Sequence, residues 1–435
     1  MREMRESGVE WMGEIPVSWQ ILTIGSVFKV RNEKVNDTDY PPLSVTKGGV
    51  VPQMENVAKS DANDNRKMVL SNDFVINSRS DRKQSCGVSP MDGSVSLINT
   101  VLYPANGAPV IPAYLNYLLK NYGFAEEFYR WGHGIVADLW TTRWQEMKSI
   151  LLPIPSMGEQ QQILEAISEK TDKVDTLIAN VQAQIEKLKT YKQSLITEVV
   201  TKGLDPNVPM KDSGVNYLGR IPSGWSIISI GQAFTYVGGF AFKSELFTTD
   251  ETQYQVLRIG NVKNDNLILD NKQIYVDGAC AESAKVAEVH IDDILFTMTG
   301  TKGKHDYFYT LLVNENHTSD RHLFINQRVG LFRAKSSKIK MAFANYVLKE
   351  KRILDYIFLS ETGTANQGNI GIENIARTKL YLPSLAEQEQ IVSYLDEKCS
   401  QIDRLIALKE EKIEKLEQYK HSLIYECVTG KREVV

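Results

Sequence analysis

Two polar segments of the chain carry side chains that proteins use to contact nucleic acids. Each follows a short run of β-forming residues, Phe74–Asn77 in one case and Ile294–Thr297 in the other. Arginine can bind guanine edges and glutamine can pair with adenine, while lysine, serine and threonine favour phosphates. These segments predict DNA contacts, although each could also be an ordinary solvated turn. The candidate residues are Arg79, Ser80, Arg82, Lys83 and Gln84 in the first segment, and Thr301, Lys302, Lys304 and His305 in the second.

A later loop in each half of the chain has a similar character. Gly363–Asn369 contains Asn366 and Gln367, whose amides suit a loop near DNA, and Arg130–Gly134 occupies the matching place in the first half. Trp131 is equally compatible with a buried aromatic residue. We predict that Asn366 and Gln367 also contact DNA.

The sequence shows no constellation for catalysis or metal binding. His317 and His322 lack companions at metal-ligand spacing, and the glycines around Lys302 do not have the spacing of a phosphate loop. Asp39–Pro42 contains the residues of the Asp-Pro-Pro-Tyr motif of adenine methyltransferases, but in the wrong order. We therefore predict no catalytic residues, no cofactor and no metal.

Composition sets further bounds. The chain has 435 residues, 42% of them apolar and 24% charged, and a formal net charge of −4. Any DNA-binding surface must therefore be local. No apolar run is long enough for a membrane span or a signal peptide, and the four cysteines are too scattered for a disulfide framework. We expect a cytoplasmic protein that does not contact a membrane.

Two segments of the sequence are repeated, while the residues between the repeats differ. Residues 7–25 and 213–231 share 10 of 19 positions at an offset of 206. Residues 185–201 and 413–429 share 12 of 17 positions at an offset of 228. Two copies at so long a period do not make a solenoid. The pattern indicates a duplicated module with two different recognition parts.

Each module ends in a predicted long helix. Between Gly158 and about Thr201 there is no proline and no further glycine, and apolar residues recur at the spacing of a coiled-coil seam. The same seam returns 228 positions later, so we expect the two helices to pack together. Four charged residues recur on the outer faces, which predicts either docking of two copies of one partner or ordinary helix solvation. They are Glu186, Lys187, Glu414 and Lys415.

The remaining segments have a mixed pattern of short β-rich runs and one helical stretch each. These stretches are Tyr114–Tyr129 and Ala342–Leu359, and Asn116–Lys120 closely matches Asn345–Lys349. The sequence thus predicts an α+β fold with two domains of similar topology. The expected boundaries are 1–155 for the first domain, 156–203 for the first helix, 204–383 for the second domain and 384–430 for the second helix.

Several motifs resemble those of the specificity subunits of type I restriction-modification systems. Each module opens with an Ile-Pro pair followed by a tryptophan, and each long helix opens with a Pro-x-x-x-Glu-Gln motif or a slightly degraded copy of it. The residues are Ile15-Pro16 with Trp19, Ile221-Pro222 with Trp225, Leu152–Ile163, Leu382–Ile391 and the glycine-rich segment Asp293–Lys304. Two copies in the same order make the resemblance specific.

This resemblance implies a non-catalytic subunit with two target-recognition domains, each reading one half of a split double-stranded DNA site. The helices would form an antiparallel coiled coil that sets the distance between the half-sites, with pseudo-twofold symmetry matching the pseudo-dyad of DNA. The implied partners are two methyltransferase subunits and, in the full complex, two motor-nuclease subunits.

Two other classes of protein remain open from the sequence. One is a coiled-coil scaffold that does not bind DNA and presents two protein-interaction domains, which the near-neutral charge mildly favours. The other is an enzyme with its own active site, for which the sequence supplies only negative observations. The salt dependence of DNA binding separates the first alternative from a DNA-specificity subunit.

Overall fold

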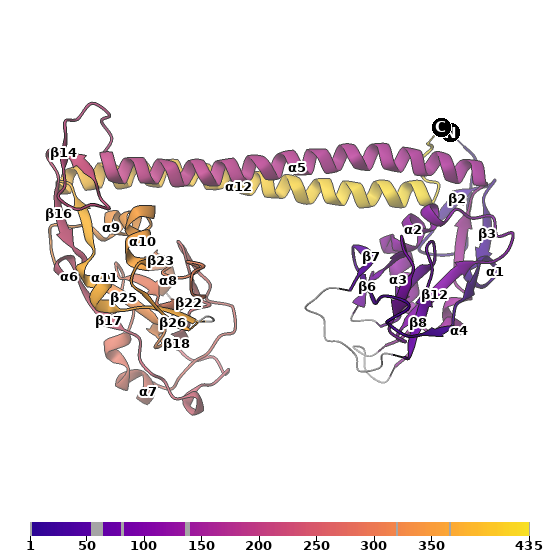
Figure 1. Ribbon diagram of the computed structural model, residues 1–435, viewed down its shortest axis with the longest axis horizontal. Helices are drawn as coiled ribbons and strands as arrows, with labels where there is room; N and C mark the ends of the chain where they lie inside the picture. Colours follow the sequence, from indigo (N-terminus) through magenta and orange to yellow (C-terminus); the bar gives the residue numbers. More distant parts are fainter. Residues whose placement is uncertain are drawn as a thin grey trace. The chain divides into compact units, whose positions relative to one another are not determined.

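The computed structural model describes residues 2–53, 64–79, 82–134, 140–318, 321–364 and 367–434 (Figure 1). The chain forms two compact units. The first unit contains Met1–Gln184 and Leu408–Val435, and the second contains Ile185–Ala407. The division falls within both long helices, α5 (Met157–Lys202) and α12 (Leu385–Val428).

The first unit joins short strands and helices to its parts of α5 and α12. The elements are β1 (Met4–Glu6), β2 (Glu14–Pro16), β3 (Gln20–Thr23), α1 (Ile24–Val27), β4 (Phe28–Val30), β5 (Lys34–Val35), β6 (Leu43–Thr46), β7 (Gly49–Pro52), β8 (Arg66–Val69), β9 (Phe74–Asn77), β10 (Cys86–Val88), β11 (Gly93–Val95), β12 (Asn99–Pro104), α2 (Pro112–Lys120), α3 (Tyr122–Arg130), α4 (Trp144–Met147) and β13 (Leu151–Ile154).

The second unit is built in the same way with additional short elements. Its elements besides the long helices are β14 (Met210–Asp212), β15 (Arg220–Pro222), β16 (Ser226–Ser229), α6 (Ile230–Ala233), β17 (Phe234–Gly238), η3 (Ser244–Leu246), β18 (Tyr254–Leu257), β19 (Val262–Lys263), β20 (Asn266–Leu267), α7 (Gly278–Ser283), η4 (Lys285–Ala287), β21 (Ile294–Thr297), β22 (Thr299–Gly300), β23 (Thr310–Leu312), α8 (Glu315–Thr318), β24 (His322–Ile325), β25 (Val329–Ala334), α9 (Met341–Val347), α10 (Lys351–Phe358), β26 (Glu361–Thr364), β27 (Gln367–Ile370), α11 (Ile372–Arg377) and β28 (Lys379–Leu382).

The central sheets of the two units have the same topology: when the four strands are numbered in chain order, they lie side by side as 1-4-2-3 in both sheets. The order is β4-β12-β9-β10 in the first unit and β17-β25-β21-β23 in the second, and every pairing is antiparallel. A hairpin near the start of each unit, β1–β2 or β14–β15, is also repeated. The surrounding strands differ: β18 and β24 form a parallel pair in the second unit. The α+β class and the two long helices expected from the sequence are confirmed.

Both predicted helical stretches of the recognition segments are interrupted. The first forms α2 and α3, and the second forms α9 and α10. Asn121 and Glu350 are extended at the breaks, and their side chains accept hydrogen bonds from the backbone N–H groups of Phe124 and Ile353. Each cap starts a new helix, so each segment has two helices where the apolar periodicity predicted one.

The long helices pack through the predicted seam within each unit. In the first unit Lys420 donates to Asp175 at 2.6 Å and Lys409 donates to Gln184 at 2.5 Å. Residue numbers rise along one helix while those of the bonded partners fall along the other, so the two helices are antiparallel. In the second unit Lys192 bonds Asp403 at 2.7 Å. The Lys192–Asp403 and Asp175–Lys420 pairs are related by the 228-residue offset, 420 − 192 and 403 − 175. The same cross-helix bond is therefore made once in each unit.

The repeated motifs fasten each long helix to its unit. The indole of Trp19 donates to Glu159 at 2.9 Å, and the indole of Trp225 donates to Glu387 at 2.9 Å. Both indole rings are almost fully buried, so each needs a hydrogen-bond acceptor of this kind. The Ile-Pro and Glu-Gln motifs are thus two halves of one anchor.

The glutamine of each motif completes this anchor. Gln388 is fully buried; its amide donates to the carbonyl oxygens of Lys338 and Pro383 and accepts from the N–H of Lys340. Gln160 makes the same three kinds of bond in the first unit, to Pro109, Pro155 and Ile111. Sequence spacing placed these residues at a helix start, and the structure adds their bonding role.

Alkaline pH should destabilise the folded chain. Burial raises the pKa of the Cys86 thiol from 9.0 to about 12, and burial raises the pKa of Tyr217 from 10.0 to about 12 against the opposing hydrogen bond from the Lys379 backbone. A group with a higher pKa in the folded state stabilises it below the unfolded-state pKa and loses that contribution as pH rises toward the folded-state pKa. We expect the free energy of unfolding, measured by chemical denaturation, to fall between about pH 9 and pH 12. Cys86→Ala should make the fall shallower; an equally steep fall would contradict the assignment to this thiol.

Candidate nucleic-acid interface

The structure brings most of the second polar segment together with the later loop. Strand β22 pairs with β27, with Gly300 opposite Gly368, so Thr301 and Gln367 continue from neighbouring strands of the β22-β27-β26 sheet. Lys302, Lys304 and His305 follow in the same exposed segment. Two segments that are far apart in sequence therefore present polar side chains from one edge.

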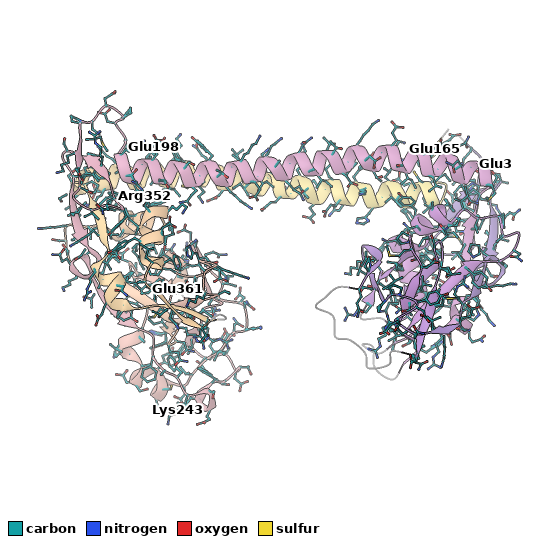
Figure 2. The ribbon with its side chains drawn as sticks, viewed as in Figure 1. Glu3, Glu165, Glu198, Lys243, Arg352 and Glu361 are labelled. Carbon is teal, nitrogen blue, oxygen red and sulfur yellow. The ribbon has the colours of Figure 1, made fainter. Side chains whose placement is uncertain are left out.

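One carboxylate shapes this segment. Glu361 of β26 (Figure 2) accepts from the N–H of Gly303 at 2.9 Å and from the hydroxyl of Tyr307 at 2.9 Å. Burial, followed by the hydrogen bond to Glu361, raises the pKa of Tyr307, so this hydroxyl keeps its donor proton. The bond to Gly303 joins residues 58 positions apart, which is why sequence reasoning missed Glu361.

Other contacts restrict which predicted side chains extend from the loop. The ammonium group of Lys302 donates to the carbonyl oxygen of Gly363 at 3.0 Å. The ring of His305 stacks on Phe358, with centroids 4.2 Å apart and planes 7° apart. Because both side chains have intramolecular partners, exposed Lys304 is the stronger candidate for a direct DNA contact.

The first polar segment is also partly engaged within its own unit. Lys83 forms an ion pair with Glu126, and its ammonium group lies 5.9 Å from the ring centroid of Tyr122. Arg79 is exposed and its backbone bridges to Thr141, while Arg82 is exposed. Gln84 adopts a positive φ of 62° and lines a cavity. The predicted residues Ser80 and Asn366 lie outside the described residues.

The four predicted partner-contact residues are exposed on the long helices. Glu186 pairs with Lys189, and Lys415 pairs with Glu411, each within its own helix. Glu414 accepts a hydrogen bond from Gln418, and Lys187 is exposed. Exposure allows partner docking but is equally expected of a solvated helix face.

Exposed apolar side chains are a more informative feature of the same helices. Leu177 and Leu405 are each 47% exposed, and Tyr191 and Tyr419 are 58% and 48% exposed. Each pair is related by the 228-residue offset, 405 − 177 and 419 − 191. Each unit therefore carries one such leucine and one such tyrosine. Singly exposed apolar side chains are common on protein surfaces, so it is the repetition that makes these four positions candidates for contact with a partner.

Among the residues that the structure describes, no group of three or more histidine, cysteine, aspartate and glutamate side chains is arranged to hold a metal ion. None of the helices in that part of the chain combines the length and apolarity needed to span a membrane.

Two α+β units with the same central sheet, each fastened by the same anchor to the long helices, define a duplicated scaffold. Comparison with known proteins shows which proteins this scaffold resembles. Residues 222–418 match the family model described as the type I restriction modification DNA specificity domain. The chain is therefore similar to the specificity subunits of type I restriction-modification systems.

Relatives in two organisms carry the same description. The chain is 26% identical over 291 residues to the type I restriction enzyme MjaVIII specificity subunit of Methanocaldococcus jannaschii, covering 66% of this chain and 63% of that subunit. It is 25% identical over 225 residues to the EcoBI specificity subunit of Escherichia coli, covering 51% and 42%. The match to MjaVIII thus spans just under two thirds of that relative.

The fold has a counterpart among solved structures. A chain from a structure concerned with complex assembly and conformational transition of the type I R-M system superposes with a TM-score of 0.66. Sequence identity is 16%, and the match covers 96% of this chain and 99% of the other. This similarity shows a shared fold.

Proposed function

We propose that this chain is the DNA sequence-specificity subunit of a type I restriction-modification complex, with each unit reading one half of a bipartite double-stranded DNA site. The observation that carries the proposal is a central sheet and helix anchor built twice around unlike polar loops. A shared frame with different loops would give two readers of the same construction and independent sequence preference. The functional boundaries follow the division 1–155, 156–203, 204–383 and 384–430.

The helices supply the spacing between the half-sites in this proposal. Antiparallel packing within an approximate twofold arrangement matches the pseudo-dyad of duplex DNA, and the length of the coiled coil sets the separation of the half-sites. The anchors support this role, because Glu159 and Glu387 fix each long helix to a buried tryptophan of its unit.

The partners in the proposal are two methyltransferase subunits and, in the full complex, two motor-nuclease subunits. Glu186, Lys187, Glu414 and Lys415 would contribute to methyltransferase docking. The repeated exposed pairs Leu177/Leu405 and Tyr191/Tyr419 support docking of two copies of one partner, because each unit offers the same apolar side chains. This chain itself would be non-catalytic and need no cofactor.

A second candidate is a scaffold with two protein-interaction domains and no DNA binding. The internal bonds of Lys83 and Lys302 favour this candidate, because these two side chains already have partners within the chain. A salt titration separates the candidates, since neutralising several phosphates makes affinity fall steeply with salt. A shallow dependence, or no DNA binding by the assembled complex, would favour the scaffold.

Lys304→Ala should weaken DNA binding by the assembled complex by roughly 1–3 kcal/mol if this side chain reads a base, with altered preference in one half-site only. Arg82→Ala should do the same at the other half-site. Binding would be measured at fixed salt on DNA libraries that vary each half-site separately. Lys285→Ala, which removes an exposed lysine paired with Glu282, is the control. Unchanged binding by both loop variants would remove these loops from the interface.

A further inference from the structure

A small cavity in the first unit lies beside the first polar segment. Its volume is about 210 Å³, smaller than the roughly 300–1,000 Å³ of drug-sized ligand pockets. It is lined by Lys47, Gln84, Asn116, Tyr117, Lys120, Asn121, Tyr122, His421 and Ile424. No carboxylate is among these residues, so the only formal charges lining the cavity are positive.

Three elements fix the two lysines around this cavity. Lys47 lies in the turn of the β6–β7 hairpin, and Lys120 is the last residue of α2. Gly87 of β10 lies between these elements: a Cβ there would be 3.1 Å from the Cα of Gly49 and 3.4 Å from Oδ1 of Asn116. The absence of a side chain at Gly87 thus lets the hairpin turn approach α2.

The second unit has a counterpart built from equivalent elements. Lys349 corresponds to Lys120 in the repeated Asn-Tyr motif, and the turn of the β19–β20 hairpin replaces that of β6–β7. Ile196 of α5 lines this counterpart, as Ile424 of α12 lines the first cavity, and the two are 228 positions apart. The counterpart supplies an internal comparison for the first cavity.

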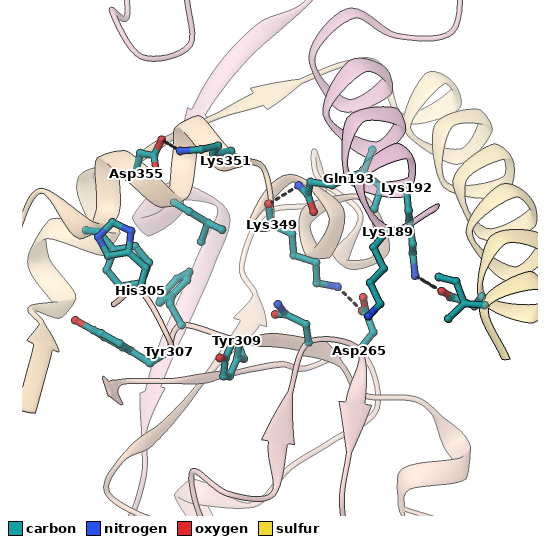
Figure 3. Close-up of a pocket in the computed structure, with 17 residues that line it drawn as sticks. Lys189, Lys192, Gln193, Asp265, His305, Tyr307, Tyr309, Lys349, Lys351 and Asp355 are labelled. Atoms are coloured by element: carbon teal, nitrogen blue, oxygen red, sulfur yellow. Dashed lines mark hydrogen bonds and ion pairs between the residues drawn. The ribbon is translucent and has the colours of Figure 1, made fainter. Parts of the chain in front are cut away.

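The two cavities differ in charge at the hairpin turn. In the second unit the turn carries Asp265, which forms an ion pair with Lys349 (Figure 3). Asp265 also accepts from the amide of Asn345 at 3.1 Å. In the first unit the turn carries Lys47. Within the described residues neither Lys47 nor Lys120 forms an ion pair. The first unit therefore has a second cation where the second unit has the counter-ion.

Lys47 and Lys120 both line this small cavity, and their like charges repel each other. A bound anion would offset this repulsion, because it attracts both lysines. Lysine is a common phosphate ligand, and amides such as that of Gln84 donate to phosphate oxygens. The nearby carboxylate of Glu126 is already paired with Lys83. The cavity thus offers two lysines and amide donors, the kinds of group that bind an oxyanion.

We propose that Lys47, Lys120 and Gln84 form a phosphate-binding site in the first unit, and that its ligand is a phosphodiester of the DNA backbone next to the first half-site. The DNA source rests on the proposed function, whereas the phosphate chemistry stands on the cavity alone. Among the described residues, the counterpart cavity of the second unit lacks this arrangement, because Asp265 pairs with Lys349. DNA would therefore be held asymmetrically, with one additional backbone contact in the first unit.

The first arm of the test uses inorganic phosphate. Binding to the full chain would be measured by calorimetry at low salt, with sulfate as a second probe. Lys120→Gln should weaken binding roughly ten-fold or more, as expected for losing a charge-assisted hydrogen bond. Lys47→Asp should do the same by reproducing the ion pair of the second unit, and because Lys47 is exposed this variant should fold normally. Lys148→Gln, at an exposed lysine elsewhere in the unit, is the control.

The second arm uses DNA and the assembled complex. Lys120→Gln should reduce the slope of log affinity against log salt by roughly 0.9, the amount for one phosphate contact. One uncharged methylphosphonate in the backbone should weaken binding by the parent complex and cause no further loss in Lys120→Gln. If the chain binds phosphate but Lys120→Gln leaves the slope of log affinity against log salt unchanged, the ligand is a free anion and not the DNA backbone. Failure of the parent chain to bind phosphate, together with an unchanged slope, would overturn the site. If the parent complex does not bind DNA at all, the proposed function is refuted. The calorimetry with inorganic phosphate would then still show whether the cavity binds an anion.

Discussion

Replacing Gln388 with alanine should lower the free energy of unfolding of the second unit by roughly 2–4 kcal/mol. The side chain is fully buried, and its amide bonds the Lys338 and Pro383 carbonyl oxygens and the Lys340 N–H group. Alanine would leave these backbone groups buried without a partner, and each such loss costs about 1–3 kcal/mol. Water entering the space would offset part of the sum.

Hydrogen exchange over residues 338–341 and 379–391 would measure the effect, because these segments carry the bonds. Glu389→Ala is the matched control: it removes the neighbouring side chain, which is exposed and pairs with Lys340 at the surface. Gln160→Ala should have the same effect in the first unit. Equal exchange in Gln388→Ala and the parent chain would show that the glutamine is not the fastener that the structure indicates.

Inserting one heptad into both long helices should lengthen the spacer of the recognised DNA site by about three base pairs and leave both half-sites unchanged. Seven residues add about 10 Å of helix, and successive base pairs are about 3.4 Å apart. A seven-residue insertion also preserves the phase of the seam. The insertions belong after Gln184 and after Ala407, where the chain divides into its two compact units.

Maps of modified bases in cells that carry the engineered complex would give the spacer directly. Each unit would keep its own cross-helix bond, Asp175–Lys420 or Lys192–Asp403. A two-residue insertion in both helices is the control, because it turns the seam by about 200° away from the partner helix and should abolish recognition rather than lengthen the spacer. An unchanged spacer after the heptad insertion would refute the proposal that helix length sets the distance between half-sites.

The long helices could be predicted from sequence because a seam at regular spacing has one structural solution. Predicted strands such as Phe74–Asn77 and Ile294–Thr297 were also confirmed, since short β-forming runs between turn residues are typical of a central sheet. The breaks at Asn121 and Glu350 were missed because a side-chain cap can start a new helix within a continuous helical pattern.

The candidate interface was less predictable, because it depends on long-range contacts. Residue type placed Lys83 and Lys302 among the DNA contacts, but the fold supplies them with Glu126 and the Gly363 carbonyl as partners. Glu361 carried no signal of its own in the sequence. Its importance arises only when β26 places it beside the 301–306 segment.

The equivalence of the Asp175–Lys420 and Lys192–Asp403 bonds has an evolutionary consequence. Each half of the chain carries one aspartate and one lysine of the set, at positions separated by 228 residues. A half inherited from a homologous gene would therefore bring complementary charges to the junction, whatever its loops contain. On the proposed function, recombination within the repeated helices would exchange one reader and leave the other intact, so new bipartite specificities would arise from existing halves.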